Sequence, residues 1–305
     1  MDGFPIAELQ YWLQPIDSIL RELSLHAYSY HYLLLAAILY WAGYRSLASR
    51  LGVVVLFSTL IFGGCRQFFP AQRPYWLDPG LFNGVKESGY GMPSGHSQNA
   101  VVFWGIIAAS IRKSIVILIA LLMIALLAVS RLYLGVHFLS QVVWGLAIGA
   151  VLVFCIMTCE KCFLSWFNRQ QQVLQLLLAF LVALIPMLVI LSLRELVEIG
   201  EGNGASKPYQ RLIFLSGMTV GMTTGLTFSK GKFLQKPSMF LWVTRVLPGI
   251  ASVCLLWSFS SGLSTGIDRS VVVYLVEGIR GLLIVWWGVW FWPGLHRKME
   301  KAYSR

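Results

Sequence analysis

Long runs of apolar residues dominate the chain, and short polar segments separate them. About nine runs approach or exceed the ~20 residues that a helix needs to cross a membrane. They cover residues 29–45, 50–69, 96–111, 113–130, 138–158, 172–193, 211–228, 238–259 and 270–293. The pattern predicts an all-α fold, a polytopic membrane helix bundle with about nine transmembrane helices.

The N-terminal residues 5–25 follow a different pattern, in which apolar residues recur at helical spacing between polar ones. The apolar members are Leu9, Trp12, Leu13, Ile16, Ile19, Leu20 and Leu23. An amphipathic helix of this kind could lie in the membrane interface or pack on the bundle, and the sequence leaves both open.

Charge refines this topology. Only 12% of the residues are charged, and the net charge is +11. The basic residues gather in alternate short loops, which are cytoplasmic by the positive-inside rule. They are Arg45, Arg50, Arg112, Lys113, Lys161, Arg169, Lys230, Lys232, Lys236, Arg297, Lys298, Lys301 and Arg305. We therefore expect an N-terminus outside, a C-terminus in the cytoplasm, membrane lipids as neighbours and no nucleic-acid partner.

The opposite loops hold basic residues that the topology rule does not explain. Arg66 and Arg73 are seven residues apart, so on one helix they would share a face, with Pro70 and Pro74 bending or ending it. The segment Gly91–Ser97 precedes the third long run; its Ser94 can cap a helix, and its Gly95 lets an anion approach free N–H groups. Arg131 and His137 link the fourth and fifth runs.

Together these segments bring three guanidiniums, two imidazoles and a helix start to one face. Arginine binds phosphate oxygens through its planar fork, and charge stabilisation is most of what phosphoryl transfer needs. One neutral histidine can attack phosphorus, while the other protonates the leaving oxygen. The sequence therefore predicts cleavage of a phosphate ester through a phosphohistidine. No carboxylate, cysteine or histidine cluster on this face suggests a metal or another cofactor.

These motifs resemble the type-2 phosphatidic acid phosphatase superfamily, whose pattern is Lys-x6-Arg-Pro, Pro-Ser-Gly-His and Ser-Arg-x5-His-x3-Asp. The resemblance covers residues 66–141 and implies a metal-independent phosphoric ester hydrolase. It implies phosphate binding by Arg66, Arg73, Ser94, Gly95 and Arg131. It implies His137 as the nucleophile and His96 as the general acid.

Two departures from the family pattern stand out. Arg66 replaces the lysine, and Gln141 replaces the aspartate that orients the nucleophilic histidine. A glutamine at this place is similar to the glucose-6-phosphatase branch of the family. We expect the side-chain oxygen of Gln141 to accept a hydrogen bond from His137. The spacing from His137 to Gln141 is one helical turn, although Gln141 could also be a packing residue. We expect a bacterial inner-membrane protein with its site facing the periplasm.

The chain is thus expected to comprise an amphipathic segment at 1–28, catalytic transmembrane helices at 29–158 and C-terminal transmembrane helices at 159–305. A lipid phosphate or polyprenyl diphosphate is the favoured substrate, and a sugar phosphate is the alternative. A phosphotransferase to a lipid acceptor, a haloperoxidase and a silent transporter or scaffold also stay open. In the distal helices, Glu277 and Arg280 are expected to pair, either locking helices together or lining a substrate entrance, and Arg245 lies at membrane depth.

Overall fold

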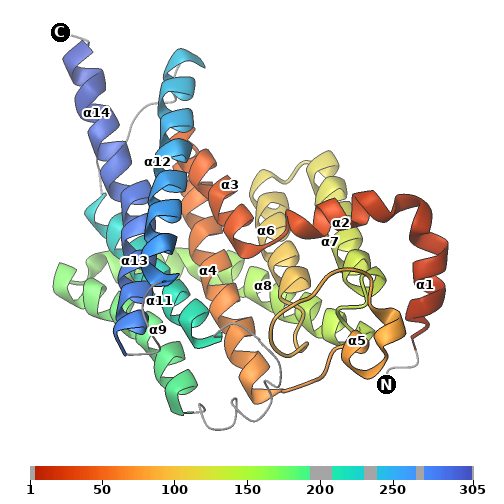
Figure 1. Cartoon of the computed structure of the whole chain (residues 1–305). Coiled ribbons are helices and arrows are strands. Elements are labelled where there is room, and N and C mark those ends of the chain that lie inside the picture. Colours follow the sequence, from red (N-terminus) through yellow and green to blue (C-terminus); the bar gives the residue numbers. More distant parts are fainter. Residues whose placement is uncertain (1–3, 193–207, 230–238, 266–270, 304–305) are drawn as a thin grey trace. The chain divides into compact units, whose positions relative to one another are not determined.

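The computed structural model describes residues 4–192, 208–229, 239–265 and 271–303, and its regular elements within these ranges are all helices (Figure 1). They are α1 (Ile6–Leu13), α2 (Asp17–Leu25), α3 (Ser29–Trp41), α4 (Arg45–Phe68), α5 (Pro74–Leu77), α6 (Gly95–Ile111), α7 (Ser114–Tyr133), α8 (Leu139–Arg169), α9 (Gln172–Ser192), α11 (Pro208–Phe228), α12 (Met239–Thr265), α13 (Val271–Trp286) and α14 (Trp292–Tyr303). Within the described residues, the first eight predicted apolar runs each lie mainly on one helix, and the ninth, 270–293, covers α13, the π-helical turn Trp287–Phe291 and the start of α14. The predicted all-α fold is confirmed.

Five segments within the described ranges are long and apolar enough to cross a membrane. They are Arg45–Phe68, Ser114–Tyr133, Leu139–Arg169, Val243–Ser261 and Val272–Lys298. Helices α3, with 13 residues, and α6, with 17 residues, are too short for this criterion. Membrane character is therefore supported, whereas the number nine and the orientation stay predictions. The loop charges Lys230, Lys232, Lys236 and Arg305 lie outside the described residues.

The chain folds as two compact units. Unit one takes in the described parts of 1–32, 57–163 and 189–208, and unit two those of 33–56, 164–188 and 209–305.

Unit one is built around α6, α7 and α8. Helices α6 and α7 pack as neighbours, and α8 approaches α6 through two glycines. A Cβ atom at Gly145 would lie 2.5 Å from the Ser94 carbonyl oxygen, and one at Gly149 would lie 2.7 Å from that of Gln98. Small residues one turn apart let helix backbones meet this closely. The contact fixes the start of α6 against α8.

The N-terminal stretch packs on this bundle. Helices α1 and α2 both contact α7, with Leu20 fully buried beside Tyr133. The stretch is two helices, because a 3₁₀ turn at Gln14–Ile16 with Pro15 inside it interrupts the pattern. As a result, the predicted apolar face divides: Leu20 points inward while Trp12 is 74% exposed.

Unit two also relies on glycine contacts. A Cβ atom at Gly217 would lie 2.0 Å from the Gly278 carbonyl oxygen, and one at Gly221 would lie 2.4 Å from that of Leu282. These positions bring α11 against α13 without space for side chains. Arg245 of α12 is buried and donates a hydrogen bond to the Trp41 carbonyl oxygen at 3.3 Å. A backbone carbonyl group thus accepts one hydrogen bond from this buried guanidinium.

Candidate active site

The predicted site residues all lie in unit one. Arg66 occupies the last turn of α4, and its Nε donates to the Pro93 carbonyl oxygen at 3.3 Å. The guanidinium also lies 4.9 Å from the centre of the Phe62 ring. Arg66 and Arg73 do not share a helix: α4 ends at Phe68, just before Pro70, which was expected to bend or end it, because a proline disfavours the helical conformation of the residue before it. Tertiary contacts bring the two arginines to one site.

Ser94 caps α6, as predicted. Its Oγ accepts a hydrogen bond from the Ser97 backbone N–H at 3.5 Å, and the helix begins at Gly95. A Cβ atom at Gly95 would lie 2.8 Å from the Phe62 ring, so glycine lets the start of α6 approach this ring closely. The Arg66 guanidinium contacts the same ring. The first turn of α6 presents His96, whose side chain is largely buried. This is the helix start that the sequence assigned to anion binding.

Arg73 is fully buried in a cage of carbonyl groups. Its Nε donates to Gly89 at 2.9 Å, and its Nη2 donates to Ser88 and Tyr90, each at 3.1 Å. Its Nη1 donates to Val136 at 2.9 Å and lies 3.3 Å from His137 Nε2. Arg73 therefore organises the loop before α6 and also faces the predicted nucleophile.

The His137 imidazole is held at both ring nitrogens. Gln141 Nε2 donates to the Gln72 carbonyl oxygen at 2.8 Å, so its Oε1 faces His137 Nδ1 at 3.0 Å. Because Oε1 only accepts, this contact assigns the ring proton to Nδ1 and leaves a lone pair on Nε2. The predicted contact between Gln141 and His137 is present, and its part in catalysis stays a prediction.

Electrostatics keep this imidazole neutral. Burial lowers the pKa of His137 well below its usual value, and the charges of Arg73, Arg131 and Arg66 lower it further. Burial also lowers the pKa of Arg73 to about 10, which leaves it protonated at neutral pH. A neutral histidine beside cationic groups suits nucleophilic attack on a phosphate.

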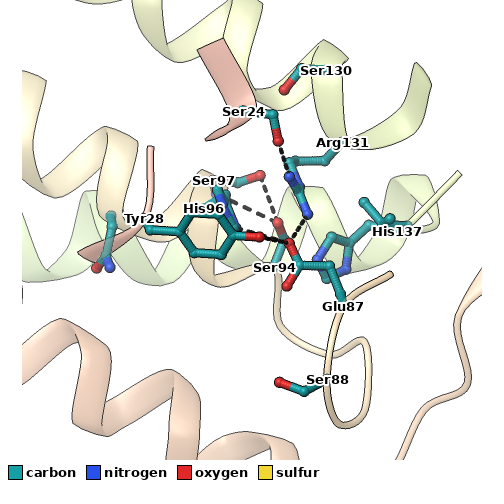
Figure 2. A network of polar contacts seen from close by, with 12 residues as sticks. Ser24, Tyr28, Glu87, Ser88, Ser94, His96, Ser97, Ser130, Arg131 and His137 are labelled. Atoms are coloured by element: carbon teal, nitrogen blue, oxygen red, sulfur yellow. Dashed lines mark hydrogen bonds and ion pairs between the residues drawn. The ribbon is translucent and has the colours of Figure 1, made fainter. Parts of the chain in front are cut away.

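Arg131 lies in the last turn of α7 and is fully buried. Its Nη1 donates to Ser24 Oγ, and its Nη2 donates to Glu87 Oε1 at 2.5 Å. Figure 2 shows the Glu87 carboxylate in the middle of the group, with Arg131, His96 and Tyr28 around it. The structure thus brings Arg66, Arg73 and Arg131 together with both histidines, and it adds a carboxylate to them.

Sequence reasoning missed Glu87, Tyr28 and Ser24. Glu87 stands in an irregular polar loop between Lys86 and Ser88, and no spacing ties it to either motif. Tyr28 and Ser24 come from the end of the N-terminal stretch, which was assigned to the membrane interface or to bundle packing. Their approach to Arg131 follows from the packing of α2 on α7, which a linear pattern does not specify. Within the described residues, no group of three or more His, Cys, Asp or Glu side chains could hold a metal ion.

Comparison with known proteins agrees with the motifs. Residues 47–164 match the PAP2 superfamily. Lipid phosphate phosphatase delta of Arabidopsis thaliana is 24% identical over 251 residues, which are 74% of this chain and 58% of that protein. Phosphatidylglycerophosphatase B of Bacillus subtilis (strain 168) is 34% identical over 113 residues, which are 33% of this chain and 55% of that protein.

The chain spans somewhat more than half the length of these two relatives. No solved structure gave a significant match. The predicted site residues all fall inside the matched segment, whereas Tyr28 and Ser24 precede it. The family whose model matches residues 47–164 is the one that those motifs resemble.

Proposed function

We propose that this protein is a membrane phosphatase that hydrolyses a lipid phosphate ester through a phosphohistidine on His137. The observation that carries the proposal is the fixed imidazole: Gln141 Oε1 holds Nδ1 at 3.0 Å, and Nε2 faces the guanidinium of Arg73 at 3.3 Å. This arrangement directs the lone pair of a neutral histidine toward a basic site. The names of the two relatives favour a lipid phosphate as substrate.

In the first step, the Nε2 lone pair of His137 forms a bond to phosphorus while the bond from phosphorus to the ester oxygen breaks. His96 gives its proton to the departing alcohol oxygen. Arg66, Arg73, Arg131 and the N-terminal turn of α6 stabilise the charge on the three equatorial oxygens. In the second step, His96 accepts a proton from water, the water oxygen bonds to phosphorus, and the P–N bond breaks to release phosphate.

We further propose the topology given by the loop charges: about nine membrane crossings, an outside N-terminus and a cytoplasmic C-terminus. The division into residues 1–28, a catalytic part at 29–158 and a C-terminal part at 159–305 belongs to this proposal. In a bacterium, the site would face the periplasm from the inner membrane. Cysteine accessibility at loops on both sides, measured in intact cells, tests the orientation.

The decisive experiment is phosphate release by the purified protein in detergent. Phosphatidic acid, phosphatidylglycerophosphate and a polyprenyl diphosphate are compared with glucose 6-phosphate. We expect the lipids to be the better substrates, activity to persist in EDTA, and vanadate to inhibit. A preference for glucose 6-phosphate would favour the second candidate, a sugar phosphatase, which the resemblance of Gln141 to the glucose-6-phosphatase branch suggests.

The covalent step has its own test. Brief incubation with a substrate labelled with ³²P, followed by alkaline denaturation, should leave label on the protein, because a phosphohistidine survives alkali and is lost in acid. Label that survives acid would contradict a phosphohistidine. Transfer of label to an added lipid alcohol would identify a transferase.

A further inference from the structure

Glu87 belongs to the segment 82–94, which joins the 3₁₀ turn Pro79–Leu81 to the start of α6. Its carboxylate points into the basic site (Figure 2). Oε1 lies 2.5 Å from Arg131 Nη2, 3.2 Å from Tyr28 Oη and 3.9 Å from His96 Nδ1. The side chain is 8% exposed. An anion of the protein itself is therefore already bound among the groups proposed to bind phosphate.

Carboxylate and phosphate use the same recognition by arginine, since each presents oxygens to the guanidinium N–H groups. In Arg131, Nη1 is engaged with Ser24, and Nη2 is engaged with Glu87. A phosphate oxygen that binds the Nη2 N–H now bonded to Glu87 takes the place of that carboxylate. The two anions compete for this N–H group, because their like charges repel.

The main chain around Glu87 is firmly fixed. Tyr75 Oη donates to the Glu87 carbonyl oxygen at 3.1 Å and accepts from its backbone N–H at 3.3 Å. Arg73 holds the next three carbonyl groups, those of Ser88, Gly89 and Tyr90, at 2.9–3.1 Å. Exchange therefore requires only rotation of the Glu87 side chain, while the loop stays in place.

We propose that Glu87 is an internal competitor of phosphate: its carboxylate occupies the place of phosphate on Arg131 between turnovers and sets the affinity of the site for phosphate groups. The inference rests on the proposed function and adds a specificity-determining residue to it. Three arginines would otherwise hold the inorganic phosphate product tightly. Return of the carboxylate to Arg131 weakens that hold and favours product release.

The size of the effect follows from competition. A site that is available for only a fraction of the time binds its ligand more weakly by that fraction. If the Glu87–Arg131 pair is formed for about 90–99% of the time, phosphate affinity falls roughly ten- to hundredfold. Removal of the charge should restore it.

The test measures binding of inorganic phosphate to the purified full-length protein through its thermal stabilisation, which needs no turnover. We expect Glu87→Gln to lower the apparent Kd for phosphate at least about tenfold. Glu22→Gln is the matched control, because Glu22 lies on α2 of the same unit, is 67% exposed and pairs only loosely with His26 at 3.4 Å. It should leave the Kd unchanged.

A second variant keeps the proposal testable if Glu87→Gln fails to fold. Tyr28→Phe keeps the ring that packs 4.6 Å from His96 but removes the hydroxyl that donates to Glu87. Loss of one such bond should free Arg131 more often and tighten phosphate binding a few-fold. Unchanged or weaker phosphate affinity in both variants would overturn the proposal and make Glu87 a support for Arg131 or His96.

The two proposals fail separately. If the wild-type protein hydrolyses lipid phosphates but Glu87→Gln does not tighten phosphate binding, the competitor is wrong and the phosphatase stands. If Glu87→Gln tightens phosphate binding but the wild-type protein cleaves no ester, the phosphatase is wrong and the internal competition stands.

Discussion

Two buried ion pairs of the same chemistry occupy very different settings in this chain. In unit two, Glu277 and Arg280 are three residues apart on α13 and meet at 3.0 Å. In unit one, Glu87 lies in a loop and Arg131 in the last turn of α7. Their side chains lie 2.5 Å apart, although the two residues are 44 positions apart in the sequence. The first pair forms wherever α13 forms, whereas the second depends on how a loop is placed against a helix.

The surroundings differ as well. The Arg280 guanidinium lies 5.0 Å from the centre of the Phe214 ring and 5.1 Å from that of Trp257, and its Nε donates to Ser260 at 3.0 Å. Glu87 and Arg131 instead face His96 and Tyr28. Buried charge alone therefore does not indicate a reactive site. The Glu87–Arg131 pair joins separate elements beside titratable groups, whereas aromatic rings and a serine surround Arg280.

Among all substitutions in the two units, those at the histidines of unit one should lower the rate of phosphate release most. His137→Ala should lower the rate of phosphate release by roughly 10⁴–10⁶-fold, because it removes the attacking atom. His96→Ala should cost roughly 10²–10⁴-fold, and less with a nitrophenyl ester, whose leaving oxygen needs no proton. Steady-state assays at matched protein folding check both. Substantial activity in His137→Ala would refute the phosphohistidine.

The next largest effect concerns Gln141 of unit one. Gln141→Ala should lower kcat roughly ten- to hundredfold, since the Nδ1 proton of His137 loses its acceptor. Gln141→Glu keeps an acceptor for Nδ1 but places a second oxygen against the Gln72 carbonyl oxygen. Because the acceptor stays, kcat should fall less than in Gln141→Ala. Equal activity in Gln141→Ala and the wild-type protein would remove Gln141 from the mechanism.

The glycine contacts allow the two units to be compared directly. A Cβ atom would meet the Ser94 carbonyl oxygen at Gly145 and the Leu282 carbonyl oxygen at Gly221, at 2.5 and 2.4 Å. Both alanine substitutions should destabilise the protein by about 1–3 kcal/mol. Only Gly145→Ala should also lower kcat, by about tenfold, because it displaces the start of α6 and with it His96. Thermal unfolding and kinetics of both variants test this, and equal kinetic losses would contradict it.

Sequence patterns captured the helices well and the site in part. Apolar periodicity located α4 and α6–α8 closely, because a membrane helix satisfies its backbone internally and shows its length in the sequence. Ser94 and Gln141 were also predictable, since a cap and a contact one turn away are local. Glu87 was not, because its role arises from the folding of an irregular loop. The carbonyl groups that hold Arg73 were not predictable for the same reason.

Acid should affect unit one through His137. The pKa of His137 in the folded protein lies below the value of about 6.5 in the unfolded chain. Above pH 6.5 the imidazole is neutral in both states and does not change stability. Below that pH the unfolded chain binds a proton that the folded protein does not, so the folded state loses stability. Stability should fall by up to about 1.4 kcal/mol per pH unit below pH 6.5. His137→Gln lacks this titration, so from pH 6.5 to pH 5 its unfolding temperature should fall less than that of the wild-type protein. A constant difference would contradict a depressed pKa.

The smallest effect on activity is expected from the ion pair of unit two. Glu277→Gln removes a charge but keeps an acceptor for Arg280, which retains Ser260 and two aromatic rings. Stability should fall by about 1–3 kcal/mol, the range for weakening a buried charged hydrogen bond, while kcat, KM and phosphate affinity stay within about twofold of the wild-type values. Thermal unfolding, lipid kinetics and phosphate binding are measured beside Glu87→Gln, in which phosphate affinity is expected to change most. A shift in substrate preference without loss of stability in Glu277→Gln would instead make this pair the wall of a substrate entrance, and the contrast between the two ion pairs would fail.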